Sequence, residues 1–154
     1  MPRTHDGRGC RRKTLFVDPG LTTGLLLVAE LEDELVIELC LSTPDITVVV
    51  HHAQQANRIV VEDYRPRPGS RFVADPVPAQ IVGRLTGLHV ELVKQDPSAK
   101  KVGTMGKLDR LGWRTIAHSD HERDAMAHAI HRYLLEGHPF MERMVRDLVK
   151  ETIA

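Results

Sequence analysis

Three acidic residues stand at positions where a folded chain could gather them into one site. Asp18 and Glu62 each directly follow a short apolar run of the kind that forms a buried strand. If these strands are parallel neighbours, both carboxylates lie at the same edge of the sheet, where open sheets place ligand sites. Asp124 lies one turn into a predicted helix that could face that edge. Carboxylates held about 4–6 Å apart repel one another, which indicates a bound cation or a raised pKa.

Two further candidates share the helix face of Asp124. His121 precedes it by three residues and Asp120 by four, so helical periodicity places the three side chains together. Asp120 also has a plain structural interpretation, because an acid in the first helical turn offsets the helix dipole. Oxygen donors with at most one imidazole suit Mg²⁺ or Mn²⁺ better than zinc. Two such ions about 4 Å apart would activate a water and stabilise the leaving oxygen of a phosphodiester.

The apolar patterns predict a mixed sheet that positions these residues. The expected strands span residues 14–18, 22–31, 35–42, 58–64 and 89–94. Short turns join the first three strands, which predicts an antiparallel meander. A helix over about 43–56 then makes a right-handed crossover, so the fourth strand should lie parallel to the first and beside it. The fifth strand should extend this parallel part of the sheet.

Later segments predict the helices that flank the sheet. They lie at 78–87, 97–111, 120–136 and around 140–149. Ser119 and Glu122 form a capping-box pattern, so Ser119 should be the N-cap of the third of these helices. Ala125, Ala127 and Ala129 are small enough to let that helix sit close to the sheet. The architecture is therefore α/β, with a five-stranded mixed sheet.

Length and composition bound the class of protein. The chain has 154 residues, 42% hydrophobic and 27% charged, which is typical of one globular domain. No apolar run reaches the roughly 18 residues of a membrane span, and no signal-peptide segment follows the basic start. Cys10 and Cys40 are too few and too far apart for a zinc motif. We expect a cytoplasmic protein with a basic flexible arm, residues 1–13, and one folded domain, residues 14–154.

Basic residues are unevenly distributed although the formal net charge is zero. Local basic segments matter more for contacts with phosphate than the overall sum does. The clusters nearest the candidate site are Arg65, Arg67 and Arg71, and then Lys100, Lys101 and Lys107. They favour a nucleic-acid partner, with solvated loops as the alternative.

Three motifs in order resemble those of a known nuclease group. They are FVDPGLTTG at 16–24, IVVEDY at 59–64 and HERDAMAHAI at 121–130. Together they resemble the RuvC-type Holliday-junction resolvases of the ribonuclease H-like superfamily, and the short, divergent form is similar to phage members. The resemblance covers roughly residues 14–136 and implies the ribonuclease H-like fold, with antiparallel first strands and parallel later ones.

The resemblance also implies roles for particular residues. The catalytic and metal-binding set would be Asp18, Glu62, His121 and Asp124, holding two Mg²⁺ or Mn²⁺ ions. Many members have Asp where this chain has His121, and some have His, so Asp120 stays a rival ligand. A histidine ligand would favour Mn²⁺ somewhat.

The implied activity is that of a metal-dependent endodeoxyribonuclease. It would cut four-way junctions or related branched DNA and leave 5′-phosphate and 3′-hydroxyl ends, in the cytoplasm of a bacterial host cell. Members of the group act as homodimers whose two-fold symmetry matches the near two-fold symmetry of a junction. The implied DNA-binding residues are Arg65, Arg67, Arg71, Phe72, Lys100, Lys101 and Lys107. Phe72 could equally pack beneath its own loop.

Other interpretations remain open at this point. An RNA-processing nuclease of the same superfamily shares the first motif. The segment DPGLTTG also resembles the phosphate loop of actin-like and sugar-kinase phosphotransferases, which need two such domains. A non-catalytic DNA-binding relative would have no reason to keep a cluster of like charges. His128 and His131 share the face of Asp124 but are predicted to be packed or dimer-facing rather than ligands.

Overall fold

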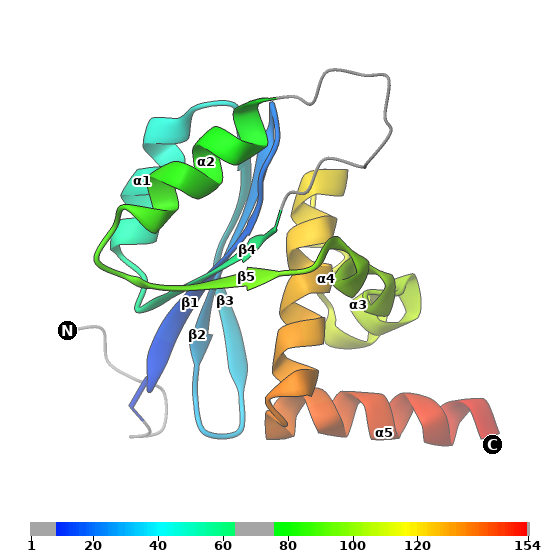
Figure 1. The fold of residues 1–154 in the computed structure, drawn as a ribbon. Coiled ribbons are helices and arrows are strands. Elements are labelled where there is room, and N and C mark those ends of the chain that lie inside the picture. The colour runs from blue at the N-terminus through cyan, green and yellow to red at the C-terminus, as the bar shows by residue number, and fades with distance from the viewer. Residues whose placement is uncertain (1–8, 64–75, 154) are drawn as a thin grey trace.

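A five-stranded sheet with helices on both faces forms the centre of the molecule (Figure 1). The computed structural model describes residues 9–63 and 76–153. The strand order is β3-β2-β1-β4-β5. The strands are β1 Arg12–Asp18, β2 Thr23–Glu30, β3 Leu35–Thr43, β4 Arg58–Glu62 and β5 Glu91–Gln95. The helices are α1 Ile46–Gln54, α2 Pro76–Thr86, the 3₁₀ helix η2 Pro97–Val102, α3 Met105–Leu111, α4 Asp120–Leu135 and α5 Pro139–Ile153.

The pairing of the strands confirms the predicted mixed sheet. β1, β2 and β3 are antiparallel neighbours. β4 runs parallel to β1, and β5 runs parallel to β4. The crossover through α1 is what allows β4 to return beside β1, so the ends of these two strands meet at one edge.

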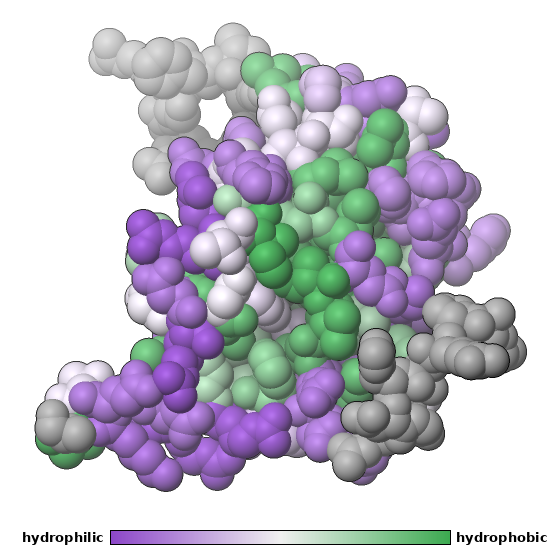
Figure 2. Space-filling model, turned by 180° about the vertical axis from the view of Figure 1, so that it is seen from behind, coloured by the Kyte–Doolittle hydropathy of each residue, from purple (hydrophilic) through white to green (hydrophobic). Residues whose placement is uncertain are grey.

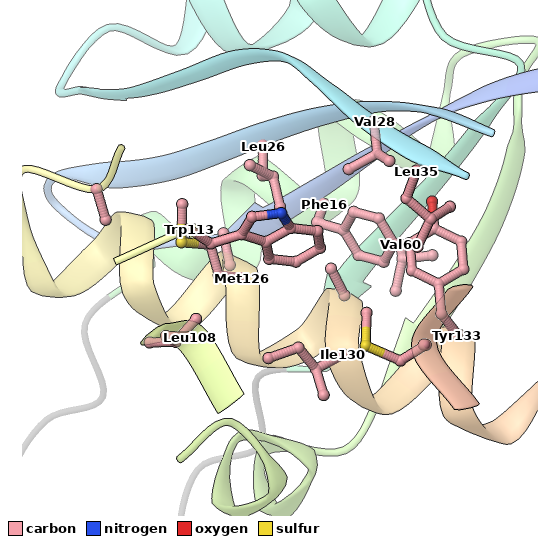
Figure 3. Close-up of a cluster of buried hydrophobic side chains, with 14 of the residues drawn as sticks. Phe16, Leu26, Val28, Leu35, Val60, Leu108, Trp113, Met126, Ile130 and Tyr133 are labelled. Atoms are coloured by element: carbon pink, nitrogen blue, oxygen red, sulfur yellow. The ribbon is translucent and has the colours of Figure 1, made fainter. Parts of the chain in front are cut away.

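Two apolar layers cover the two faces of the sheet. Side chains alternate along β1, so Leu15 and Val17 pack toward α1 and α2 while Phe16 packs toward α4. Figure 1 shows α1 and α2 on one side of the sheet and α4 on the other. In the second layer, Phe16 meets Tyr133 edge to face with ring centroids 5.4 Å apart, beside Trp113 (Figure 3). The sheet is therefore held rigidly on both sides.

Helix α4 approaches the sheet more closely than a side chain would allow. A Cβ added at Gly24 of β2 would lie 2.1 Å from the backbone oxygen of His121. A Cβ added at Gly103, just after η2, would lie 2.2 Å from the Cβ of Ala127. Two glycines therefore set the distance between α4 and the segments on either side of it.

The first turn of α4 is tied to the edge strand β3. Ser119 is the N-cap, as predicted, and its hydroxyl accepts a hydrogen bond from the backbone N–H of Glu122. The Glu122 side chain is buried, and its Oε2 accepts a hydrogen bond from the Ser42 hydroxyl at 2.7 Å. The Cys40 thiol lies 3.3 Å from the other oxygen, and burial, reinforced by Glu122, raises the pKa of that thiol to about 12. These contacts hold the start of α4 in place.

Most segment bounds differ from the sequence-based expectation by a few residues, and two of the differences have a clear cause. β1 begins at Arg12 rather than at residue 14, because Arg12 pairs with Glu30 at 2.8 Å across the β1–β2 ladder. The segment 97–111 is not one helix but η2 followed by α3. The break lies at Gly103, where the chain passes against α4 too closely for helical side chains to fit. In both places a long-range contact outweighs the local pattern.

The surface seen from behind the view of Figure 1 carries a central band of hydrophobic side chains flanked by polar ones (Figure 2). Among the described residues, no helix is both long enough and apolar enough to cross a membrane.

Candidate active site

The ends of β1 and β4 bring two carboxylates together at one edge of the sheet. Val17 pairs with Val61 in the parallel ladder, so Asp18 and Glu62, one residue further along each strand, are neighbours. Asp18 is 5% exposed, and the Glu62 side chain is 13% exposed. The arrangement concentrates negative charge in a place that water reaches poorly.

Helix α4 adds two more of the candidate residues. The Nδ1 atom of His121 lies 3.3 Å from Oδ2 of Asp18. The Asp124 carboxylate reaches the same region, where the ammonium of Lys100 lies 3.6 Å from its Oδ2 and 3.2 Å from Oε2 of Glu62. The structure thus gathers Asp18, Glu62, His121 and Asp124, and adds Lys100 as a cation between two of the acids.

Asp120 does not join this cluster. Its side chain is 90% exposed, and its carboxylate pairs with Arg123 one turn further along the helix. This pairing lowers the pKa of Asp120. The geometry matches a charge at the start of α4 that offsets the helix dipole, and it leaves His121 as the nearer candidate ligand.

The two strand-end carboxyls have opposite pKa shifts. Burial raises the pKa of Asp18 to about 8, helped by its hydrogen bond with Glu62 and by repulsion from Glu62 and Asp124. Burial also opposes ionisation of Glu62, but hydrogen bonds from His128, Asp18 and Lys100 outweigh it and lower its pKa to about 2. At neutral pH, Asp18 therefore keeps a proton and donates it to the ionised Glu62.

This retained proton predicts how stability depends on pH when a chelator removes divalent ions. Asp18 in the folded state holds its proton up to pH 8 or so, whereas an unfolded Asp loses it near its ordinary pKa of 3.8. The unfolded state binds fewer protons in this window, so the free energy of unfolding falls as pH rises. Compared with Asp18→Asn, wild type should lose about 3–4 kcal/mol between pH 5 and pH 8. Urea unfolding of both proteins at each pH measures the difference.

The opposite shift of Glu62 acts outside that window. Its lowered pKa contributes stability above the ordinary Glu range, and that contribution disappears only in strong acid. A stability difference between wild type and Asp18→Asn that stays constant from pH 5 to 8 would show that Asp18 titrates normally.

Lys100 acts as a built-in counter-ion for the cluster. Burial lowers its pKa, but the three nearby carboxylates outweigh burial, and the pKa is raised overall. Its ammonium contacts both Glu62 and Asp124, so it remains charged at any physiological pH. This lysine offsets part of the repulsion among the acids and thereby keeps the pKa of Asp18 from rising further.

The donor atoms match Mg²⁺ or Mn²⁺ in kind. The three carboxylates are hard oxygen ligands, the single imidazole is a borderline ligand that favours Mn²⁺ over Mg²⁺, and crowding of the acids creates a place where a cation is favoured. Within residues 9–63 and 76–153, however, no three His, Cys, Asp or Glu side chains stand in a metal-binding arrangement. The His121 and Asp124 side chains are 46% and 42% exposed and have room to turn. A cation bound by these acids would compete with the Lys100 ammonium for Glu62 and Asp124.

The predicted DNA-binding residues fall into different settings. Lys100 lies inside the acidic cluster, Lys101 is exposed on η2, and the Lys107 ammonium donates a hydrogen bond to the backbone oxygen of Val102. The other four lie outside the described residues: Arg65, Arg67, Arg71 and Phe72.

Sequence reasoning missed one residue of the site. His128 was predicted to be packed or dimer-facing, and it is indeed only 1% exposed, but its Nε2 lies 3.0 Å from Oε2 of Glu62. Its position one helical turn after Asp124, on the same face of α4, could have indicated that it lies close to the acids. Gln95, at the end of β5, lies on the other side of the same imidazole.

Comparisons with known proteins support the fold. No protein-family model and no curated protein sequence matches the chain. One solved structure of Thermus thermophilus RuvC aligns with a TM-score of 0.57 at 15% identity, covering 82% of this chain and 97% of that one. A second solved structure is T. thermophilus RuvC in complex with a Holliday junction substrate. It aligns with a TM-score of 0.53 at 17% identity, covering 86% of this chain and 95% of that one. The chain therefore has the ribonuclease H-like fold found in RuvC.

Proposed function

We propose that the chain is a divalent-metal-dependent endonuclease that cuts four-way DNA junctions or closely related branched DNA. One observation carries the proposal: Asp18, Glu62 and Asp124 meet with His121 at the strand-end edge of a RuvC-like sheet. Packing alone gives no reason to gather three acids at one edge, because like charges destabilise the fold and Lys100 offsets only part of their repulsion. Two bound Mg²⁺ or Mn²⁺ ions would supply an activated water and stabilise the leaving 3′-oxygen.

The residues of the site divide the work between them. Asp18 and Glu62, which lie on strands, would bind the ions directly and would lose the proton that they share when the ions bind. His121 and Asp124, which are more exposed, would provide the remaining ligands from α4. Lys100, once displaced from the acids, would be free to pair with a DNA phosphate next to the cut. The products would be 5′-phosphate and 3′-hydroxyl ends.

A homodimer is part of the proposal. A four-way junction has near two-fold symmetry, and a two-fold dimer would place one active site on each of two opposing strands. The apolar band on the face shown in Figure 2 supplies surface that a second copy could cover. The T. thermophilus RuvC structure holds a Holliday junction substrate, which makes that DNA the first one to try.

The deciding experiment compares an end-labelled synthetic four-way junction with a linear duplex of the same sequence. We expect paired nicks near the crossover with Mg²⁺ or Mn²⁺, no nicks with chelator, and little cutting of the duplex. An RNA stem-loop in the same assay tests the RNA-processing alternative. A folded protein that cuts none of these substrates would contradict the proposal. Stabilisation by ATP in place of DNA cutting would instead support the phosphotransferase alternative.

A further inference from the structure

We infer that His128 is a positioning residue that holds the Glu62 carboxylate in the orientation the active site needs. The inference rests on the proposed function for its consequence, but it stands on contacts of its own. His128 lies on α4 beneath Glu62 and is 1% exposed. Its Nε2 is 3.0 Å from Oε2 of Glu62, and its Nδ1 is 2.8 Å from the side-chain amide of Gln95.

The hydrogen bonds around Gln95 show which atom donates and which accepts at each step of this series of side chains. Arg132 donates from Nε to Oε1 of Gln95 at 3.0 Å, and arginine can only donate. The oxygen of the Gln95 amide therefore faces Arg132, and its nitrogen faces α4. That nitrogen donates to the backbone oxygen of His128 at 3.0 Å and to its Nδ1. Nδ1 is thus an acceptor and carries no proton.

A histidine with an unprotonated Nδ1 carries its proton on Nε2. The Nε2–H group of His128 therefore donates to Glu62, and the direction of donation runs from Arg132 through Gln95 and His128 to the carboxylate. Gln95 is 3% exposed, so water hardly competes with these bonds. The imidazole acts here as a fixed donor and has no free nitrogen with which to take a proton from a substrate.

Lys100 and His128 contact the same oxygen of Glu62 but are held differently. Both reach Oε2. The Lys100 side chain is 31% exposed on a long flexible stem, whereas the His128 side chain is packed in the protein interior. When a cation replaces the Lys100 ammonium, His128 remains as the donor that keeps Glu62 from turning. Outer hydrogen bonds of this kind typically change metal affinity or activity about 10- to 100-fold.

The test combines two substitutions at this position with a control. His128→Leu removes the donor and keeps the interior apolar. His128→Gln places an amide nitrogen the same number of bonds from Cα as Nε2, so it can still donate to Glu62. His138→Leu is the control, because the half-buried His138 imidazole also contacts a polar partner, the backbone oxygen of Leu31 at 2.9 Å, and lies just beyond the C-terminal end of α4.

The first readout is Mn²⁺ binding to the metal-stripped protein, measured by calorimetry without DNA. We expect His128→Leu to bind Mn²⁺ about 10- to 100-fold more weakly than wild type. The Mn²⁺ affinity of His128→Gln should lie within about threefold of the wild-type affinity. The control should bind like wild type, and thermal unfolding of every protein confirms that it is folded. The second readout is the Mn²⁺ concentration for half-maximal nicking, which should rise in His128→Leu while junction affinity stays unchanged.

The outcomes separate this inference from the proposed function. Weakened Mn²⁺ binding in His128→Leu with recovery in His128→Gln supports the positioning role even if wild type cuts no DNA. Equal Mn²⁺ binding by wild type and a folded His128→Leu overturns it even if the junction is cut. The inference is also overturned if Mn²⁺ binding by His128→Gln is as weak as that of His128→Leu, or if wild type binds no Mn²⁺ at all.

Discussion

Replacing Asp18 with Asn is expected to abolish junction cleavage while junction binding remains. The substitution keeps the shape of the side chain but replaces the carboxyl group, which an ion could bind once it ionises, with an amide that cannot ionise. Losing one direct ligand of the proposed metal pair removes several kcal/mol of transition-state stabilisation, so nicking should fall by about 10³-fold or more. Single-turnover nicking of a labelled junction, beside a gel-shift titration in Ca²⁺, measures both quantities.

The matched control for this change is Asp109→Asn. Asp109 is an exposed acid on α3 that pairs with Arg114 at 3.2 Å, and an exposed pair of this kind contributes little to stability. Its nicking rate should equal that of wild type. If Asp18→Asn loses junction binding together with cleavage, the acid has a structural role and the catalytic interpretation is wrong.

The second large effect is expected at Gly24. This residue pairs directly with Asp18 across the β1–β2 ladder, and a Cβ there would meet the backbone oxygen of His121 at 2.1 Å. Backbone cannot move aside as a flexible side chain can, so Gly24→Ala must push α4 away from the sheet. We expect the free energy of unfolding to fall by about 3 kcal/mol or more, as for severe overpacking.

The same change should separate His121 from Asp18, so any Gly24→Ala protein that still folds should nick junctions more slowly than wild type. Gly106→Ala is the control, since a Cβ in that first turn of α3 meets nothing within 4 Å. Urea unfolding of the two variants provides the comparison. Equal stability of both variants would show that α4 does not depend on the missing side chain at Gly24.

Local signals explain why the sheet and its acidic edge could be predicted. Asp18 and Glu62 each end a run of buried apolar residues, and such a run followed by an acid indicates the end of a strand. Ser119 caps α4 because its hydroxyl satisfies a free backbone N–H, an effect confined to neighbouring residues. Features that depend on a few adjacent residues were therefore readable from the sequence.

The inner part of the site depends on distances that no local pattern encodes. Lys100 reaches the acids because η2 passes against α4 at the contact between Gly103 and Ala127. His128 meets Glu62 only because that same close approach brings α4 beside the ends of β4 and β5. Helical periodicity placed His128 on the correct face, but it could not show that an ionised carboxylate lies opposite.

The proton shared by Asp18 and Glu62 makes ion binding an exchange reaction. A cation that coordinates Asp18 near pH 7 must displace the proton that the raised pKa retains, so uptake acidifies the solution. The heat measured in a calorimeter then includes the ionisation enthalpy of the buffer that takes up the proton. The apparent affinity for the ion increases with pH until Asp18 is already ionised in the metal-free protein. Below that pH the site carries a retained proton and the Lys100 ammonium, and both must be displaced from the acids when an ion binds.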